Sequence, residues 1–355
     1  MTWLGVGVAV VAVLLPGSGW ALIGTTPGPA YLDAARSLAT AAGLALAGAC
    51  LARWDRWLGG FVLAAAVASV AVGTDLALAI AHWVALGAGG LVLVRMAAEA
   101  GHGRVLVGVL VAAGLAQAAL AVGAVLWWRP WWYEHAPTMA LGTFGNPKFL
   151  GAFLAVVVPV APLWALPPLL LGVALSQSAL AGVAAFVGLL VQPRVSWVGR
   201  MGLGAAGLAA ALGAVWTRGA GLGTLAERQE AWRIAFADLT PLDALIGHGA
   251  GAWLTTVPYR QINAAGPSRM AWPEELFAQP HSDLVGLFYA GGLVAVTLAA
   301  GWLWSHRHAL RVSPWRGAAV AVGVECALFH PLHLATLAPA YVVVLGLATA
   351  EAPHG

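Results

Sequence analysis

Residues 217–283 read TRGAGLGTLAERQEAWRIAFADLTPLDALIGHGAGAWLTTVPYRQINAAGPSRMAWPEELFAQPHSD and form the only long polar segment of this 355-residue chain. The segment carries five arginines and seven carboxylates. A polar connection of this length is either a functional platform or a disordered tether. Its apolar residues favour a small packed cap, which a tether would not need. These residues are Trp232, Phe236, Leu242, Trp253, Tyr259, Trp272 and Phe277.

Composition predicts that the rest of the chain lies in a membrane. Hydrophobic residues make up 61% of the sequence and charged residues 9%, whereas soluble domains carry about 25% charged residues. Apolar runs such as 105–128 and 284–304 are long enough to span a bilayer. The first run, 3–23, has no basic residue before it, so we expect an uncleaved first span.

Charge and cysteine content exclude other classes of protein. The formal charge of +3 comes from scattered arginines that form no basic patch, so we expect no nucleic-acid partner. Cys50 and Cys326 both lie in apolar segments and provide neither a disulfide framework nor a metal site.

The hydropathy pattern predicts an all-α integral membrane protein with about twelve transmembrane helices. Residues 1–216 hold the first nine, 217–283 form a long, partly helical loop, and 284–355 hold the last three. The seventh span is short, because at about 1.5 Å per residue eleven residues cannot cross a hydrocarbon core of about 30 Å. It is either a half-helix or continuous with its neighbours. The predicted spans are 3–23, 34–52, 57–74, 76–96, 104–128, 148–165, 167–177, 179–192, 200–216, 284–305, 317–331 and 335–350.

Basic residues predict the orientation. With twelve spans and a cytoplasmic N-terminus, nine arginines of the short loops face the cytoplasm, and Arg36, Arg129 and Lys148 face outward. This bias follows the positive-inside rule, from which long loops are left out. The 217–283 loop is therefore expected outside the cytoplasm. The nine are Arg53, Arg56, Arg95, Arg104, Arg194, Arg200, Arg307, Arg311 and Arg316.

A turn at 142–149, GTFGNPKF, leads into the span at 148–165. Glycine, asparagine and proline favour a turn with proline at the helix start. Asn146 and Lys148 have two interpretations: a helix cap with the lysine reaching to the interface, or a phosphate contact beside the functional site.

Within the polar loop, Thr224 to Glu227 has the form of a capping box and predicts a helix that begins near Leu225. Arg228 and Trp232, four residues apart, share one face of that helix. Arg233 lies one turn from Glu230, and we expect a surface ion pair there.

The glycine-spaced run 247–251 has no preceding strand, so it predicts a tight turn rather than a dinucleotide site. We expect the turn's amides, with Gly249 at its centre, to face a ligand, and His248 to be an ordinary loop residue. His281 lies where the loop re-enters the membrane, and histidine can act as a base near neutral pH.

Other polar residues lie further along the chain. His330 and His333 are interpreted as polar packing, because no local carboxylate or cysteine completes a metal site. Glu325 lies in the middle of a span and needs a partner.

The order of these motifs resembles the O-antigen ligase and O-antigen polymerase superfamily, which includes bacterial protein O-oligosaccharyltransferases. The likeness covers residues 140–305 and departs from the family at Ala179, where arginine is common, and at Ser282, where asparagine is common. The order comprises the Gly-x-Phe-Gly-Asn-Pro turn at 142–147, Ser176 and Ser178, Arg228 with Trp232, Pro241, the glycine run at 247–251, His281, and Gly291 with Gly292.

The resemblance implies a GT-C-type glycosyltransferase of the bacterial inner membrane with a long periplasmic loop. It would move a glycan from a polyprenyl (undecaprenyl) diphosphate donor to an acceptor hydroxyl, without metal or other cofactor and with inversion. For the ligase type the acceptor is lipid A-core; polymerase and protein-glycosylating activities are alternatives, and a secondary transporter is an alternative from another class. Family correspondence and charge suggest His281 and Arg228 as catalytic residues, with substrate contacts from Asn146, Lys148, Ser178, Arg218, Trp232, Gly249 and Arg260.

Overall fold

The computed structural model describes most of the chain after residue 90, and every regular element in that part is helical, with no strand among the described residues. The all-α prediction is therefore confirmed for this part of the chain. The described residues are 91–126, 140, 142, 144, 146–192, 196, 198–199, 201–202, 205–207, 209, 213, 223–249, 252–265, 280–329, 332 and 337–350.

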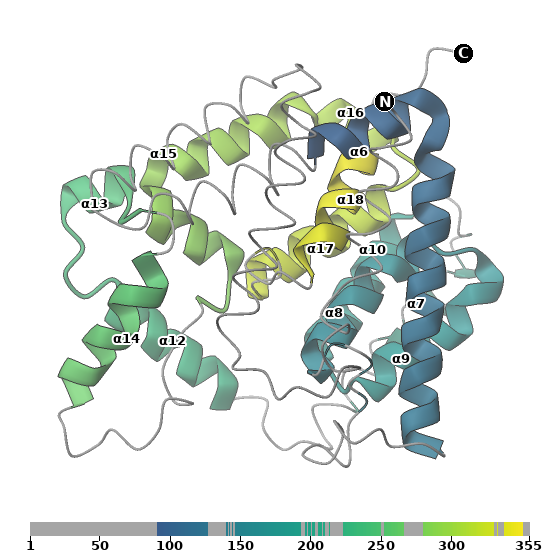
Figure 1. Ribbon diagram of the computed structural model, residues 1–355, viewed down its shortest axis with the longest axis horizontal. Helices are drawn as coiled ribbons and strands as arrows, with labels where there is room; N and C mark the ends of the chain where they lie inside the picture. Colours follow the sequence, from purple (N-terminus) through teal and green to yellow (C-terminus); the bar gives the residue numbers. More distant parts are fainter. Residues whose placement is uncertain are drawn as a thin grey trace, which may run out of the picture.

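The elements form a helical bundle and a smaller helical cap beside it (Figure 1). The bundle comprises α6 (Leu91–Ala97), η2 (Ala98–His102), α7 (Gly103–Leu126), α8 (Pro147–Val157), η4 (Val158–Val160), η5 (Leu163–Ala165), α9 (Leu166–Leu175), α10 (Ala179–Val191), α15 (Asp283–Ser305), α16 (Arg307–Val312), α17 (Arg316–Leu328) and α18 (Ala338–Thr349). The cap comprises α12 (Gly223–Ala235), α13 (Pro241–Ile246) and α14 (Ala252–Ala265).

Three of the predicted spans agree closely with observed helices. The predicted spans at 104–128, 179–192 and 284–305 match α7, α10 and α15 within two residues at each end. Two stretches, Val94–Leu126 and Asp283–Ser305, are long and apolar enough to cross a membrane by length and composition. The count of twelve spans stays a prediction, because the spans before residue 91 and most of 200–216 lie outside the described residues.

The predicted span at 148–165 is interrupted. It divides into α8, η4 and η5, with an elbow at Ala161 and Pro162 in extended conformations. Proline restricts the residue before it to extended conformations, which explains the break. The following helix, α9, has 10 residues and is about 15 Å long, so the expected short seventh segment is confirmed as a separate short helix.

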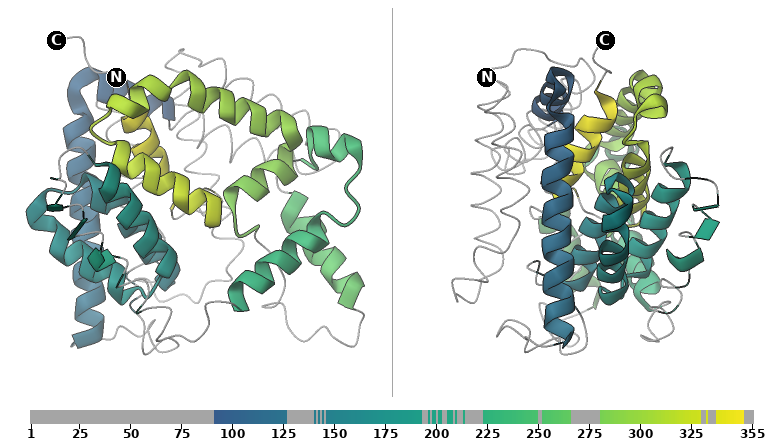
Figure 2. Two further views of the ribbon diagram at one scale, coloured as in Figure 1. Left: turned by 180° about the vertical axis from the view of Figure 1, so that it is seen from behind. Right: turned by 90° about the vertical axis from the view of Figure 1, so that its right-hand side faces the viewer.

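The bundle core takes its buried residues mainly from α7, α8, α9, α10, α17 and α18 (Figure 2). Gly188 of α10 and Gly317 of α17 allow these two helices to touch. A Cβ atom built on Gly188 would lie 2.7 Å from the Gly317 carbonyl oxygen. The Tyr341 hydroxyl of α18 donates to the Ala152 carbonyl of α8 at 3.1 Å. Small residues and one buried hydroxyl thus hold four helices around a common centre.

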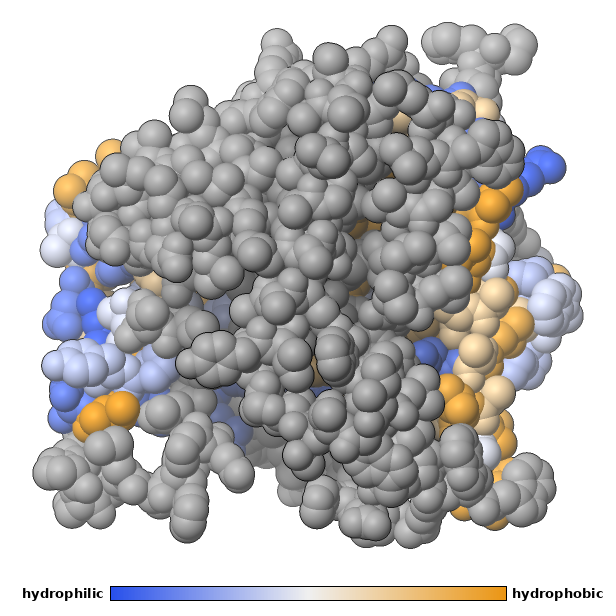
Figure 3. Space-filling model, in the orientation of Figure 1, coloured by the Kyte–Doolittle hydropathy of each residue, from blue (hydrophilic) through white to orange (hydrophobic). Residues whose placement is uncertain are grey.

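The polar loop forms a packed cap, as its apolar residues predicted. Ala231, Ala235, Trp253 and Val257 pack with Tyr289 of α15 in a buried cluster. Trp232 and Phe236 contact this cluster, whereas Leu242 and Tyr259 are exposed and play no such part. Trp272 and Phe277 lie outside the described residues. In Figure 3 hydrophilic surface gathers on the side of the cap, while hydrophobic surface follows α7.

The cap is joined to α15 at a break in that helix. Gly292 has φ 58° and ψ −157°, which interrupts the helical hydrogen bonds. The carbonyls of Tyr289 and Ala290 accept instead from the amides of His248, at 2.8 Å, and Gly249, at 2.9 Å. A Cβ atom at Gly247 would lie 2.4 Å from the Ala290 backbone. Glycine is therefore needed on both sides of this contact.

Candidate functional site

The candidate site lies where the polar loop returns to the bundle at the start of α15. His281 has φ 55°, a left-handed conformation that is uncommon for a residue with a Cβ atom. The N-cap of α15 is the next residue, Ser282, whose Oγ accepts from the Val285 amide at 3.3 Å. The N-cap of α15 is therefore Ser282 and not His281.

The turn that carries His281 is fixed to the end of α17. The Ser282 hydroxyl donates to the Ala327 carbonyl at 2.8 Å. The Asp283 amide donates to the Phe329 carbonyl at 2.9 Å, and the Asp283 carboxylate accepts from the Leu332 amide at 3.0 Å. Three hydrogen bonds to one neighbouring segment hold the histidine backbone in place.

Arg228 and Trp232 of α12 reach the same region from the cap. The Arg228 guanidinium donates to the Leu328 carbonyl at 2.5 Å, at the C-terminus of α17. The Trp232 indole donates to the carbonyl of Pro280, the residue before His281, at 2.7 Å. The prediction that these two side chains share a helix face is confirmed. The helix begins at Gly223, so the predicted start near Leu225 is two residues late.

Lys148 approaches from a third element, the N-terminus of α8. Asn146 is the N-cap of that helix, and its side chain accepts from the Lys148 amide at 2.8 Å. Phe149 contacts Phe329, with ring centroids 6.0 Å apart, which places the start of α8 beside the end of α17. The cap interpretation of Asn146 is thus confirmed, and Lys148 is exposed at the edge of the site.

The three basic groups interact electrostatically. Burial, together with the positive charges of Arg228 and Lys148, lowers the pKa of His281 from 6.5 to about 4. At neutral pH the imidazole is therefore uncharged, and in the absence of a ligand it is a weak base. Burial also lowers the pKa of Arg228, opposed by the carboxylates of Glu325 and Glu227. Lys148, Arg228 and His281, far apart in sequence, form one cluster.

Glu325 of α17 lies beneath this cluster and was expected to have a partner. Its side chain is 1% exposed, and its charge acts on Arg228. Within the described part of the chain its Oε1 atom has no hydrogen-bond partner. Arg228 is thus a basic group close enough to interact electrostatically with Glu325.

The Ser176–Ser178 turn packs against α8 close to Lys148. Ser178 is the N-cap of α10 and accepts from the Ala181 amide at 3.4 Å. A Cβ atom built on Gly151 would lie 2.6 Å from the Ser176 hydroxyl and 2.9 Å from the Ser178 Cβ. Ser178 therefore serves to begin a helix next to the site.

Two predicted substrate contacts have structural partners elsewhere. Arg260 of α14 donates to the Ala235 carbonyl at 2.9 Å and thereby caps the end of α12. The Gly249 amide, expected to face a ligand, donates to Ala290 at the break in α15. His248 is buried and stacks on Tyr289, with ring centroids 4.4 Å apart. Gly249 and His248 thus join the cap to the bundle, and Arg260 joins two helices within the cap.

Other sequence expectations had mixed outcomes. Arg233 and Glu230 form the expected exposed ion pair, at 2.6 Å. Arg218, His330 and His333 lie outside the described residues. In the part that the structure describes, no three His, Cys, Asp or Glu side chains are grouped closely enough to hold a metal ion. Sequence reasoning missed the Leu328 carbonyl, since nothing in a sequence marks a main-chain acceptor.

Comparison with protein-family models, with curated proteins and with solved structures found no match to this chain.

Proposed function

We propose that this chain is a membrane-embedded glycosyltransferase of the O-antigen ligase type, which moves a glycan from a polyprenyl diphosphate to an acceptor hydroxyl. One observation carries the proposal: Lys148, Arg228 and His281 converge from α8, α12 and the start of α15. A cationic pair beside a neutral imidazole fits a reaction with a diphosphate leaving group and a hydroxyl nucleophile.

The cationic pair would bind the diphosphate. Guanidinium groups bind phosphate through paired hydrogen bonds, and fixed positive charge stabilises the negative charge that develops on a leaving group. Arg228 is held at the C-terminus of α17 by its bond to Leu328. It thus needs little further ordering when a phosphate arrives. Lys148 supplies a second charge and fills the role that Ala179 leaves vacant.

His281 would accept the proton of the acceptor hydroxyl. In one step the hydroxyl oxygen attacks the anomeric carbon, the bond from that carbon to the diphosphate oxygen breaks, and the proton passes to an imidazole nitrogen. Polyprenyl diphosphate leaves with the bonding pair, and the anomeric configuration inverts. Because Arg228 and Lys148 lower the pKa of His281, an anionic donor between them would raise it. Donor binding would therefore strengthen the base.

Replacement of His281 tests the reaction. Asparagine tolerates the left-handed backbone, so His281→Asn keeps the turn and removes the base. We expect turnover to fall by about 10²–10⁴-fold with donor affinity nearly unchanged. Arg228→Lys should weaken donor binding as well as turnover, because it loses the planar fork. Arg233→Gln, at an exposed ion pair on the same helix, is the matched control.

The assay uses purified protein with an undecaprenyl diphosphate glycan and, in parallel, lipid A-core, a growing glycan and a protein as acceptors. Transfer to lipid A-core supports the ligase. Transfer only to one of the other acceptors would replace the ligase with a polymerase or a protein-glycosylating enzyme. Wild-type turnover in His281→Asn would refute the assigned base.

A further inference from the structure

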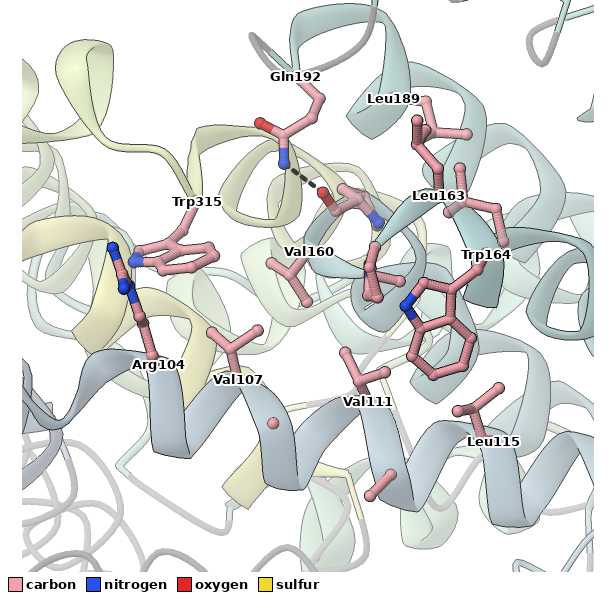
Figure 4. Close-up of a pocket in the computed structure, with 16 residues that line it drawn as sticks. Arg104, Val107, Val111, Leu115, Val160, Leu163, Trp164, Leu189, Gln192 and Trp315 are labelled. Atoms are coloured by element: carbon pink, nitrogen blue, oxygen red, sulfur yellow. Dashed lines mark hydrogen bonds between the residues drawn. The ribbon is translucent and has the colours of Figure 1, made fainter.

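A second candidate site lies at the other end of the bundle, away from His281. A groove of about 570 Å³ runs between the first half of α7, the elbow that follows η4, and the start of α17 (Figure 4). This volume falls within the range of about 300–1,000 Å³ typical of sites for small organic molecules. The residues that give the groove its character are Arg104, Val107, Val111, Leu115, Trp164 and Trp315.

The groove is elongated and apolar along α7. Val107, Val111 and Leu115 are four residues apart and form one stripe, and the stretch from Arg104 to Leu115 is about 16 Å long. Gly108 widens the groove, because a Cβ atom built there meets no other atom within 4 Å. This shape suits a flexible hydrocarbon chain.

Gln192 binds the carbonyl that the elbow leaves in the inner wall. The break between η4 and η5 removes Pro159 from a continuous helix and leaves its carbonyl without the usual helical donor. The Gln192 side-chain amide donates to that carbonyl. The Pro159 carbonyl is thus hydrogen-bonded within the wall, whereas the buried Gln192 Oε1 has no partner among the described residues. Apart from Arg104 and Gln192, the side chains that line the groove are apolar or aromatic, which suits an apolar ligand.

One end of the groove is positively charged. Arg104 and Trp315 lie together there in Figure 4, and Arg104 is exposed. Arg95 of α6, Arg311 of α16 and Arg316 at the start of α17 are further arginines at this end. Glu99 is the carboxylate described at this end, and it is bonded to Arg95 at 3.2 Å. The local charge favours an anion.

We propose that the groove binds an anionic phospholipid, with an acyl chain along α7 and the phosphate at Arg104 and Trp315. Basic pockets between membrane helices on the cytoplasmic side are suited to anionic head groups, and arginine and tryptophan both occur at membrane interfaces. The predicted orientation places Arg104 on the cytoplasmic side. The lipid site rests on the proposed function in one respect, because both require that the chain lies in a membrane. It does not depend on the transferase reaction.

Gly108→Leu tests the apolar part of the site. The glycine lies within a helix and faces open space, so leucine fills the groove without a clash and raises helix propensity. Gly123→Leu is the matched control, because Gly123 lies on the same helix, also faces open space, and does not line the groove. Both variants should unfold at or above the wild-type temperature.

Binding is measured by native mass spectrometry of the full chain in detergent with added phosphatidylglycerol or phosphatidylcholine. We expect wild type and Gly123→Leu to retain phosphatidylglycerol in preference to phosphatidylcholine, and Gly108→Leu to retain about tenfold less. Arg104→Gln should weaken retention of phosphatidylglycerol about fivefold. Arg307→Gln, at an arginine that donates to the Trp304 carbonyl outside the groove, should not.

Equal retention of both lipids by wild type would refute head-group recognition. Wild-type retention by Gly108→Leu would refute the groove as the site. His281→Asn should bind the lipid as wild type does. If wild type binds the lipid but transfers no glycan, the transferase proposal fails and the lipid site stands. If wild type transfers glycan normally but retains no lipid, the lipid site fails and the transferase proposal stands.

Discussion

Gly247→Ala is expected to separate the cap from the bundle. Gly247 has φ 76°, and left-handed backbone costs a residue with a Cβ atom about 1–2 kcal/mol. The new Cβ would lie 2.4 Å from the carbonyl carbon and oxygen of Ala290. These are backbone atoms that cannot rotate away, and overpacking of this kind costs typically about 1–3 kcal/mol. The sum is a loss of about 2–5 kcal/mol.

That loss is a large fraction of the total stability of a typical domain, about 5–15 kcal/mol. Movement at Gly247 would also strain the hydrogen bonds from His248 and Gly249 to α15. The measurements are thermal unfolding in detergent and limited proteolysis of the cap. Gly123→Ala in α7 is the control, because its new Cβ meets no atom within 4 Å. Unfolding of Gly247→Ala at the wild-type temperature, with wild-type protease resistance, would show that the described contact between α13 and α15 is wrong.

Four further outcomes are expected. Lys148→Gln should raise the midpoint of the acid limb of the kcat/KM profile, which reports the free enzyme, from about 4 by less than about one pH unit. The reason is that the ammonium is the smallest of three causes that lower the His281 pKa; an unchanged midpoint would remove Lys148 from the site. Arg260→Met should lower stability by about 1 kcal/mol, through loss of the bond to Ala235, while turnover per folded molecule stays at the wild-type level; a specific loss of turnover would restore its predicted substrate role. Asp238→Cys, exposed after α12, should react with an impermeant maleimide in whole cells, and reaction only after lysis would reverse the topology. Transfer should continue in excess EDTA, since cationic side chains can supply the charge a metal would provide; restoration of a lost activity by magnesium would contradict this.

Most helix bounds could be predicted from the sequence. Contacts between segments that are distant in the sequence could be predicted less often. The bounds of α7, α10 and α15 follow from local hydropathy and capping, as at Ser178 and Ser282. The break after α8 was missed, although Pro159 and Pro162 mark it, because the apolar run continues through both prolines. Local signals thus determine most helix ends, and a uniform apolar run conceals a break.

The candidate site was predicted in part for a similar reason. The order of motifs led to His281, Arg228 and Lys148, which the fold brings together. It also led to Arg260 and Gly249, whose polar groups are used to hold the cap. A sequence shows which side chains can donate hydrogen bonds but not which acceptors they meet. The Ala235 carbonyl that Arg260 binds is a main-chain group, so no residue type marks it in the sequence.

The break at Gly292 divides α15 into two segments with different attachments. The first segment carries His281 at its beginning and the contact with α13 at its end, separated by about nine residues, or about 13 Å of helix. A rigid rod of this length transmits displacement from one end to the other. Under the proposed function, an acceptor that displaced the cap would tilt this segment and change the orientation of the imidazole without touching the histidine.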